Sequence, residues 1–153
     1  MQAFLLASRA LVAVAARSVD DVQSDLTLPQ YRALVVLGSR GGLNVTVLAD
    51  EVGVHQTTAS RLVARLVGDG LVERETNADN RREVRLELTS AGRALLLRVR
   101  RRREDDIATI LGRMPVQGRE AATDALRAFA VAAGEQPEQH WPWVDELSPS
   151  TVG

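Results

Sequence analysis

The sequence predicts a mainly α-helical protein that carries one small β-hairpin. Apolar residues recur at helical spacing in several long stretches, whereas a period of two appears in one pair of short stretches. Aromatic residues make up only 3% of the 153 residues, so Leu, Val and Ala must build the core, which suits helices packed on helices. The length and the 45% apolar content fit a single globular domain.

Two helices are expected in the N-terminal third. Residues 3–22 are apolar almost all round, with Arg9 and Arg17 breaking the pattern. A helix this apolar needs burial on more than one side, and a partner subunit is a natural source of that burial. In "LTLPQYRALVVLG", Thr27 and Gln30 have the spacing of a capping box, which predicts a helix that ends near Gly38, before a turn at "SRGG".

Two short helices joined by a tight turn should follow. Asn44 is a good N-cap for "VTVLADEV", and Gly53 suits the position just after that helix. The next helix should begin near His55 or Gln56, and its apolar stripe has helical spacing: Ala59, Leu62, Val63 and Leu66. Because its other face is polar, the pair has a helix-turn-helix pattern.

A hairpin should come next, after "GDG" at residues 68–70. The stretches "LVERE" and "EVRLELT" have strand character, and Val84, Leu86 and Leu88 alternate with charged residues. The polar link between them is "TNADNRR", so the tip of the hairpin carries Arg81 and Arg82.

The C-terminal half should hold two more helices and a tail. Thr89 is a plausible N-cap for a helix over residues 90–112, whose centre "RVRRRREDD" contains three i,i+4 Arg–acid pairs and is best interpreted as a solvated face. A last helix should run from about residue 115 to 133. Three prolines prevent the tail from being a continuous helix. Trp141 and Trp143 either anchor this tail to the body or a partner, the interpretation we prefer, or line a pocket.

Composition narrows the chemistry. There is no cysteine, which excludes disulfides and thiolate metal sites, and His55 and His140 lack ligand spacing, so we expect no metal and no cofactor. No Ser/His/Asp set or phosphate loop is visible in the sequence. The adjacent Asp105 and Asp106 would point in different directions on a helix and would make a poor acid/base pair. We therefore expect that the protein is not an enzyme. The N-terminal stretch lacks a basic region before its apolar run, which favours a cytoplasmic helix over a signal peptide.

The charge is distributed unevenly. The net charge is −1, but residues 55–103 hold twelve Arg and six acids, whereas residues 104–153 hold three Arg and nine acids. All nineteen basic residues are arginines, whose planar fork matches phosphate and guanine edges. A basic middle with acidic flanks indicates a surface built for a polyanion, although a solvated charged face would give the same pattern.

A helix-turn-helix followed at once by a hairpin is a winged helix, and its physics fits double-stranded DNA. A helix fits the major groove, and an arginine at a narrow hairpin tip can reach phosphates or the minor groove. The candidate DNA-binding residues of the recognition helix are His55, Gln56, Thr57, Thr58, Ser60, Arg61 and Arg65, and those of the wing are Arg74, Asn80, Arg81 and Arg82.

The stretch "LADEVGVHQTTASRLVARLVGDGLVERETNADNRREVRLELTSAGRALL" resembles the winged-helix core of MarR-type (multiple antibiotic resistance) regulators. The resemblance implies a homodimer with interlocked terminal helices on a palindromic operator, usually a repressor, with release by a small aromatic or phenolic acid in some members. It implies that Arg61 helps to hold the wing and that Arg82 is the wing-tip arginine. Two departures are Asn80, where the family has an aspartate, and His55, where a Ser or Thr cap is common.

The expected organisation has four parts. Residues 1–26 form an N-terminal dimerisation helix, residues 27–89 the DNA-binding core, residues 90–134 the linking and C-terminal dimerisation helices, and residues 135–153 the tail. The alternative function is a winged-helix module that binds a protein partner and not specific DNA.

Overall fold

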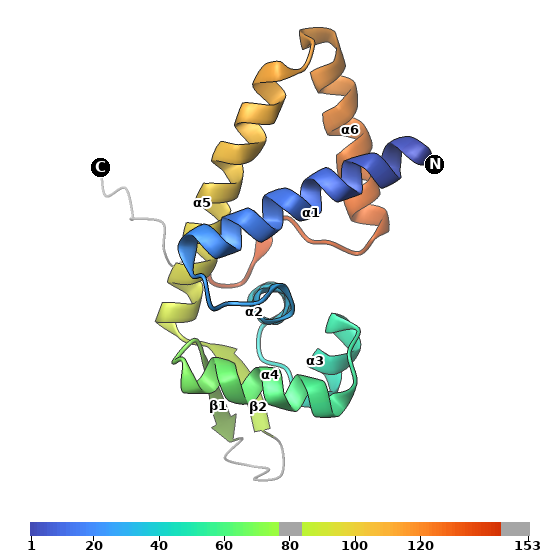
Figure 1. Ribbon diagram of the computed structural model, residues 1–153. Coiled ribbons are helices and arrows are strands. Elements are labelled where there is room, and N and C mark those ends of the chain that lie inside the picture. Colours follow the sequence, from blue (N-terminus) through green and yellow to red (C-terminus); the bar gives the residue numbers. More distant parts are fainter. Residues whose placement is uncertain (77–83, 145–153) are drawn as a thin grey trace, which may run out of the picture.

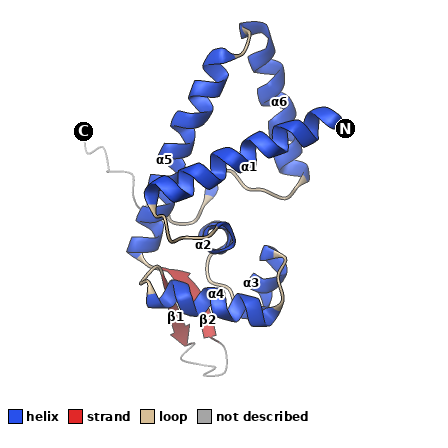
Figure 2. Cartoon of the chain, in the orientation of Figure 1, coloured by secondary structure: helices blue, strands red, loops and turns tan. Residues whose placement is uncertain are grey.

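The computed structural model describes residues 1–76 and 84–144, and it shows mostly helices with one two-stranded sheet (Figures 1 and 2). The mainly helical fold class with a hairpin wing is therefore confirmed. In chain order the elements are α1 (Gln2–Val22), α2 (Leu28–Arg40), α3 (Val45–Val52), α4 (Gln56–Gly68), β1 (Val72–Thr76), β2 (Val84–Leu88), α5 (Ser90–Arg113), α6 (Val116–Ala132) and a short 3₁₀ turn, η1 (Glu138–His140).

The core lies where α2, α3, α4 and the hairpin meet the base of α5. Leu34 of α2, Val63 of α4, Leu86 of β2 and Leu95 of α5 are all completely buried there. The alternation expected in the second strand is present, since Leu86 and Leu88 are buried while Arg85 is exposed. This body carries the site, and α5 and α6 form an arm that extends away from it (Figure 1).

The predicted helix caps are confirmed. The Thr27 hydroxyl accepts from the Gln30 backbone N–H, and the Gln30 side chain accepts from the Thr27 N–H, which completes the capping box. Asn44 and Thr89 cap α3 and α5 through a single bond each, in which their side-chain oxygens accept from the backbone N–H of Val47 and of Gly92. Gly53, at φ 77°, ends α3 in the left-handed conformation that only glycine adopts without strain.

The predicted end of α2 is wrong by about half a turn. The helix continues through Gly38 to Arg40, so Ser39 and Arg40 are helical and are not part of a turn. The chain leaves the helix at Gly41, where φ is 77°. Gly38 has a different role, because a Cβ there would lie only 3.1 Å from the Leu96 Cδ1 atom and from the Trp141 ring. The missing side chain makes room for these neighbours.

The hairpin is antiparallel and is extended on one side by a third short segment. Val72 pairs with Leu88 and Thr76 with Val84 at the two ends of the register. Leu43, just before α3, forms a bridge with Leu86, whose N–H donates to the Leu43 carbonyl over 2.8 Å. The wing is thus fixed to the segment that leads into the helix-turn-helix.

The first turn of α5 is pressed against the base of the wing. Gly92 is buried, and a Cβ at this position would overlap the Leu71 carbonyl oxygen. The Thr89 N–H donates to that same carbonyl over 3.1 Å, and the Thr89 hydroxyl donates to the Gly70 carbonyl over 2.6 Å. Backbone therefore meets backbone at this junction, with no side chain between.

The arginine run of α5 ties neighbouring elements together. Arg102 forms ion pairs with Asp21 of α1 (2.7 Å) and with Asp106 (2.9 Å). Arg103 stacks on the ring of Tyr31 of α2, with 5.1 Å between its guanidinium carbon and the ring centroid. Two of the expected i,i+4 pairs are present, at Arg100–Glu104 and Arg102–Asp106. The run is thus more than a solvated face, because it also joins α5 to α1 and α2.

α1 and α6 leave much apolar surface uncovered. α6 has no buried residue among its seventeen, although the sequence gives it an apolar stripe, and Phe129 remains 57% exposed. In α1 the buried residues are Val14, Ser18 and Val19, while the N-terminal half is exposed. With a mean hydropathy of 1.3, α1 also has the length and composition of a membrane span, but core helices of soluble proteins and signal sequences share that property.

Candidate nucleic-acid interface

The predicted recognition helix, α4, lies at the end of the molecule opposite to the tip of the arm (Figure 1). Its buried stripe holds Ala59, Val63 and Leu66, which attach it to the core. The opposite face is polar. All seven candidate residues of this helix are exposed: His55, Gln56, Thr57, Thr58, Ser60, Arg61 and Arg65. The helical spacing thus directs a row of hydrogen-bonding groups outward.

The start of α4 is held by few side-chain contacts. His55 occupies the N-cap position without a side-chain hydrogen bond to the helix, as expected for a residue that caps poorly. The backbone N–H groups of the first turn therefore lack a cap from this side chain. Such groups, together with the positive end of the helix dipole, favour an anion such as a DNA phosphate.

Two side chains of the polar face already have partners. The Gln56 amide donates to the hydroxyl of Thr46, on α3, over 3.0 Å, so it links the two helices of the motif. The Ser60 hydroxyl donates to the Gln56 carbonyl over 2.9 Å. Gln56 thus helps to set the angle between α3 and α4, and a change at this residue would affect more than a base contact.

Arg65 is placed differently from the other candidates. Its guanidinium pairs with Asp69 at 3.1 Å and with Asp25 at 3.5 Å, near the C-terminal end of α4. Two carboxylates partly neutralise this arginine and connect α4 to the segment between α1 and α2. This geometry favours a positioning role for Arg65, and it leaves the direct contact with DNA as a prediction.

The wing lies beside α4, and the first of its candidate residues is Arg74 on β1. Arg74 is exposed, and it faces Leu86 across the hairpin. Asn80, Arg81 and Arg82 lie outside the described residues, so their predicted roles remain predictions. Arg85, which was not among the candidates, donates to the Gly42 carbonyl over 3.2 Å and holds β2 to the segment before α3.

Comparison with known proteins places this arrangement in a family. The model of the MarR family matches residues 24–83. The crystal structure of RV1404 from Mycobacterium tuberculosis superposes with a TM-score of 0.84 at 39% identity, over 89% of this chain and 92% of that one. The chain belongs to the MarR family.

Other members agree with this assignment. A MarR family protein from Bacillus stearothermophilus shares the fold, with a TM-score of 0.71 at 23% identity, over 88% of this chain and 95% of that one. The HTH-type transcriptional regulator PetP of Rhodobacter capsulatus is 33% identical over 95 residues, which are 62% of this chain and 56% of PetP. The chain spans about half the length of the curated relatives it matches. The curated relatives, PetP among them, are named as HTH-type transcriptional regulators and not as enzymes, in agreement with the prediction from the sequence.

Proposed function

We propose that this protein is a transcriptional regulator that binds double-stranded DNA in a sequence-specific manner as a homodimer. The observation that carries the proposal is the exposed polar face of α4 beside an arginine-bearing wing. Thr57 and Arg61 lie on this face, where the major groove could receive them. A DNA partner also implies a cytoplasmic protein.

The uncovered faces of α1 and α6 support the homodimer. The two helices lie close together, away from α4 (Figure 1). Phe4 and Phe129 stack there with ring centroids 5.5 Å apart. A second copy would cover the exposed apolar residues there: Leu5, Leu6, Leu11, Val12, Val116, Leu126 and Val131. A two-fold dimer would present two copies of α4, which is why we expect a palindromic operator.

We further propose that the protein is a repressor and that a small aromatic or phenolic acid releases it from DNA. A cavity of about 340 Å³ between the C-terminal part of α1 and the start of α2 has a fitting chemistry. Its lining combines the apolar Val19 and Leu26 with Arg17, whose long 3.8 Å ion pair with Asp106 could give way to a ligand carboxylate.

The test is a gel shift with the DNA that flanks the protein's own gene, at several salt concentrations and with a panel of aromatic acids. We expect affinity for one palindromic site to fall steeply with salt, because phosphate contacts release counterions. A matched pair of variants localises the contact: Arg82→Ala should weaken binding, whereas Arg127→Ala, on α6, should not.

Equal affinity for any duplex, or binding that ignores salt, would reject sequence-specific DNA binding. Capture of one protein partner by a chain that ignores its flanking DNA would instead support the protein-binding alternative.

A further inference from the structure

The segment after α6 folds back onto the body, and we call residues 134–144 the C-terminal strap. Gly134, at φ 77°, lets the chain reverse at the end of α6. The strap then runs from the C-terminal end of α6, the end away from the tip of the arm, back to the lower part of α5 (Figure 1). The two tryptophans of the chain both lie in it, and both are buried, Trp141 at 6% and Trp143 at 5% exposure. They anchor the strap to the body, as the sequence analysis preferred.

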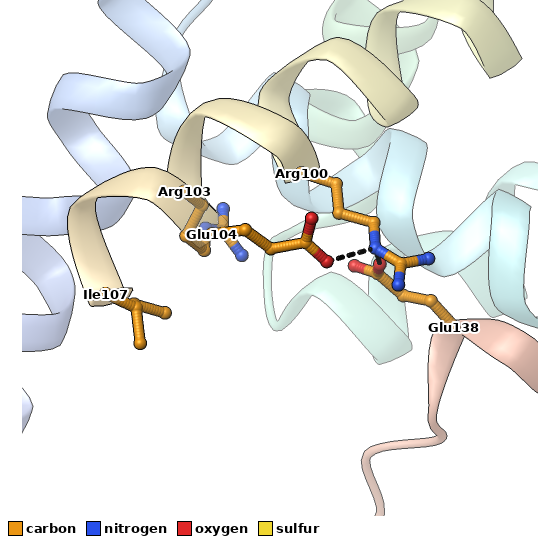
Figure 3. A pocket seen from close by; sticks show the side chains of 5 residues that line it. All are labelled: Arg100, Arg103, Glu104, Ile107 and Glu138. Carbon is orange, nitrogen blue, oxygen red and sulfur yellow. Dashed lines mark hydrogen bonds and ion pairs between the residues drawn. The ribbon is translucent and has the colours of Figure 1, made fainter. Parts of the chain in front are cut away.

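Two ion pairs hold the first part of the strap. Glu135 pairs with Arg32 of α2 at 2.7 Å. Glu138 pairs with Arg100 of α5 at 3.0 Å, and Figure 3 shows the Arg100 guanidinium between the carboxylates of Glu138 and Glu104. Burial raises the pKa of the Glu138 carboxyl, while the positive charge of Arg100 acts in the opposite direction. The strap is therefore attached to both α2 and α5.

The last part of the strap caps the C-terminal end of α2. The Trp143 indole N–H donates to the Gly38 carbonyl over 2.9 Å in a buried position. Gly38 lies in the last turn of α2, where carbonyls lack an intrahelical N–H partner. Trp141 packs directly against the bare Cα of Gly38, and its indole N–H has no hydrogen-bond partner within the described residues. The two buried indole rings thus differ in one respect: the Trp143 N–H donates a hydrogen bond, and the Trp141 N–H does not within the described residues.

These contacts connect two parts of the molecule that have different tasks. α2 packs in the body that carries α4, while α5 and α6 form the arm that bears the uncovered apolar surface. Within one chain α6 has no buried residue, and the strap links its C-terminal end to the body in addition to the junction with α5 and the contact of Phe129 with Phe4. The docked strap therefore braces the C-terminal end of α6 against the body on which α4 lies.

We propose that the strap is a positioning element, and that its docking sets which spacing of DNA half-sites the dimer accepts. This inference rests on the proposed function, because only a dimer that binds a palindrome has a spacing preference. One added base pair moves a half-site by about 3.4 Å along the DNA and also rotates it, so a rigidly held pair of α4 helices should reject it.

The test compares Trp143→Phe with Trp141→Phe. The first change removes the hydrogen bond to Gly38, whereas the second removes an N–H without a partner within the described residues. Both replace an indole ring by a phenyl ring, so they lose the same atoms. From the usual worth of one hydrogen bond, Trp143→Phe should lower the docking constant of the strap by about 2- to 10-fold more than Trp141→Phe. Fluorescence of the remaining tryptophan and its quenching by iodide measure docking directly, without DNA.

The operator measurement separates positioning from simple stability. Loss of folded protein would lower the apparent affinity for every duplex by one factor. Loss of positioning would instead bring the affinities for the natural spacing and for spacings changed by one or two base pairs closer together. We expect this convergence for Trp143→Ala and, to a smaller extent, for Trp143→Phe, whereas Trp141→Phe keeps the preference of the parent protein.

A distance measurement tests the positioning role without DNA. Because the chain has no cysteine, Ala64→Cys on the exposed side of α4 gives a single labelling site per chain. Pulsed electron paramagnetic resonance should show a narrow distribution between the two labels of the dimer, and a broader one when Trp143→Phe is added.

The outcomes are distinct. A parent protein that binds no palindrome rejects the proposed function, while the label distances still test the strap. A released strap with an unchanged spacing preference and unchanged label distances overturns the positioning role. If Trp143→Ala does not fold, Trp143→Phe decides the matter, because it keeps an aromatic ring at this position and removes the N–H that donates to the Gly38 carbonyl.

Discussion

Replacing Phe129 by alanine tests the proposed dimer most directly. Phe129 is 57% exposed in a single chain. An aromatic side chain buries about 150–250 Å² when it is fully covered, so a partner would remove about 100 Å² of this ring from water. At about 25 cal/mol per Å² this contributes about 2.5 kcal/mol per protomer. A two-fold dimer uses the site twice, so Phe129→Ala should weaken the dimer by about 5 kcal/mol.

This loss corresponds to a dissociation constant raised by a factor on the order of 10³, after allowance for the Cβ that alanine keeps. Sedimentation equilibrium over a wide range of concentrations measures it. The control is Arg127→Ala on the same helix, whose side chain is 72% exposed and pairs with the similarly exposed Asp124. Equal dissociation constants for the two variants would show that the dimer does not use this face of α6, and the burial argument would fail.

Three further sets of variants test the body and the interface. Leu34→Ala should lower the free energy of unfolding by about 2–5 kcal/mol in urea titration, because this fully buried side chain would leave a cavity. Thr27→Ala should cost about 1 kcal/mol in the same assay, since it removes the hydroxyl of the capping box; an unchanged midpoint would contradict a role for the cap. Thr57→Ala should relax the preference for particular base pairs while keeping the salt slope, whereas Arg82→Ala should reduce that slope by about 1, and gel shifts at varied salt distinguish the two.

Local signals in the sequence were enough to predict most of the fold. Each capping residue, Thr27, Asn44 and Thr89, acts on backbone groups only a few residues away, so its chemistry is visible without the tertiary structure. The same holds for the alternation of Leu86 and Leu88. The end of α2 escaped prediction because Gly38 is selected by distant neighbours, Leu96 and Trp141, and not by its own turn.

The candidate interface was predictable in outline for the same reason. Helical periodicity separates the buried stripe of α4 from its polar face, so the exposure of Thr57 and Arg61 follows from the sequence. Periodicity does not show which polar side chains already have partners. The pairing of Arg65 with Asp25 and the bond from Gln56 to Thr46 depend on how helices pack, and so the sequence could not assign these two residues a positioning role.

The contacts of the arginine run and the strap illustrate a second limit. The i,i+4 pairs of α5 were visible, yet Arg102 also reaches Asp21, eighty-one residues away in the chain. Likewise, two tryptophans in a proline-containing tail indicate an anchor, but they do not show where on the body it binds. The binding position is the C-terminal end of α2, where the Trp143 indole N–H donates to the Gly38 carbonyl, 105 residues away in the chain.

The close approach of Gly92 to the Leu71 carbonyl has a mechanical consequence for DNA binding. Because backbone packs directly against backbone at this point, the base of the hairpin and the first turn of α5 should move together as one rigid unit. In the proposed complex, DNA that twists or bends under the wing would then exert force on α5, and through it on the proposed dimer interface. In the opposite direction, a small tilt of α5 would move the base of the hairpin with it.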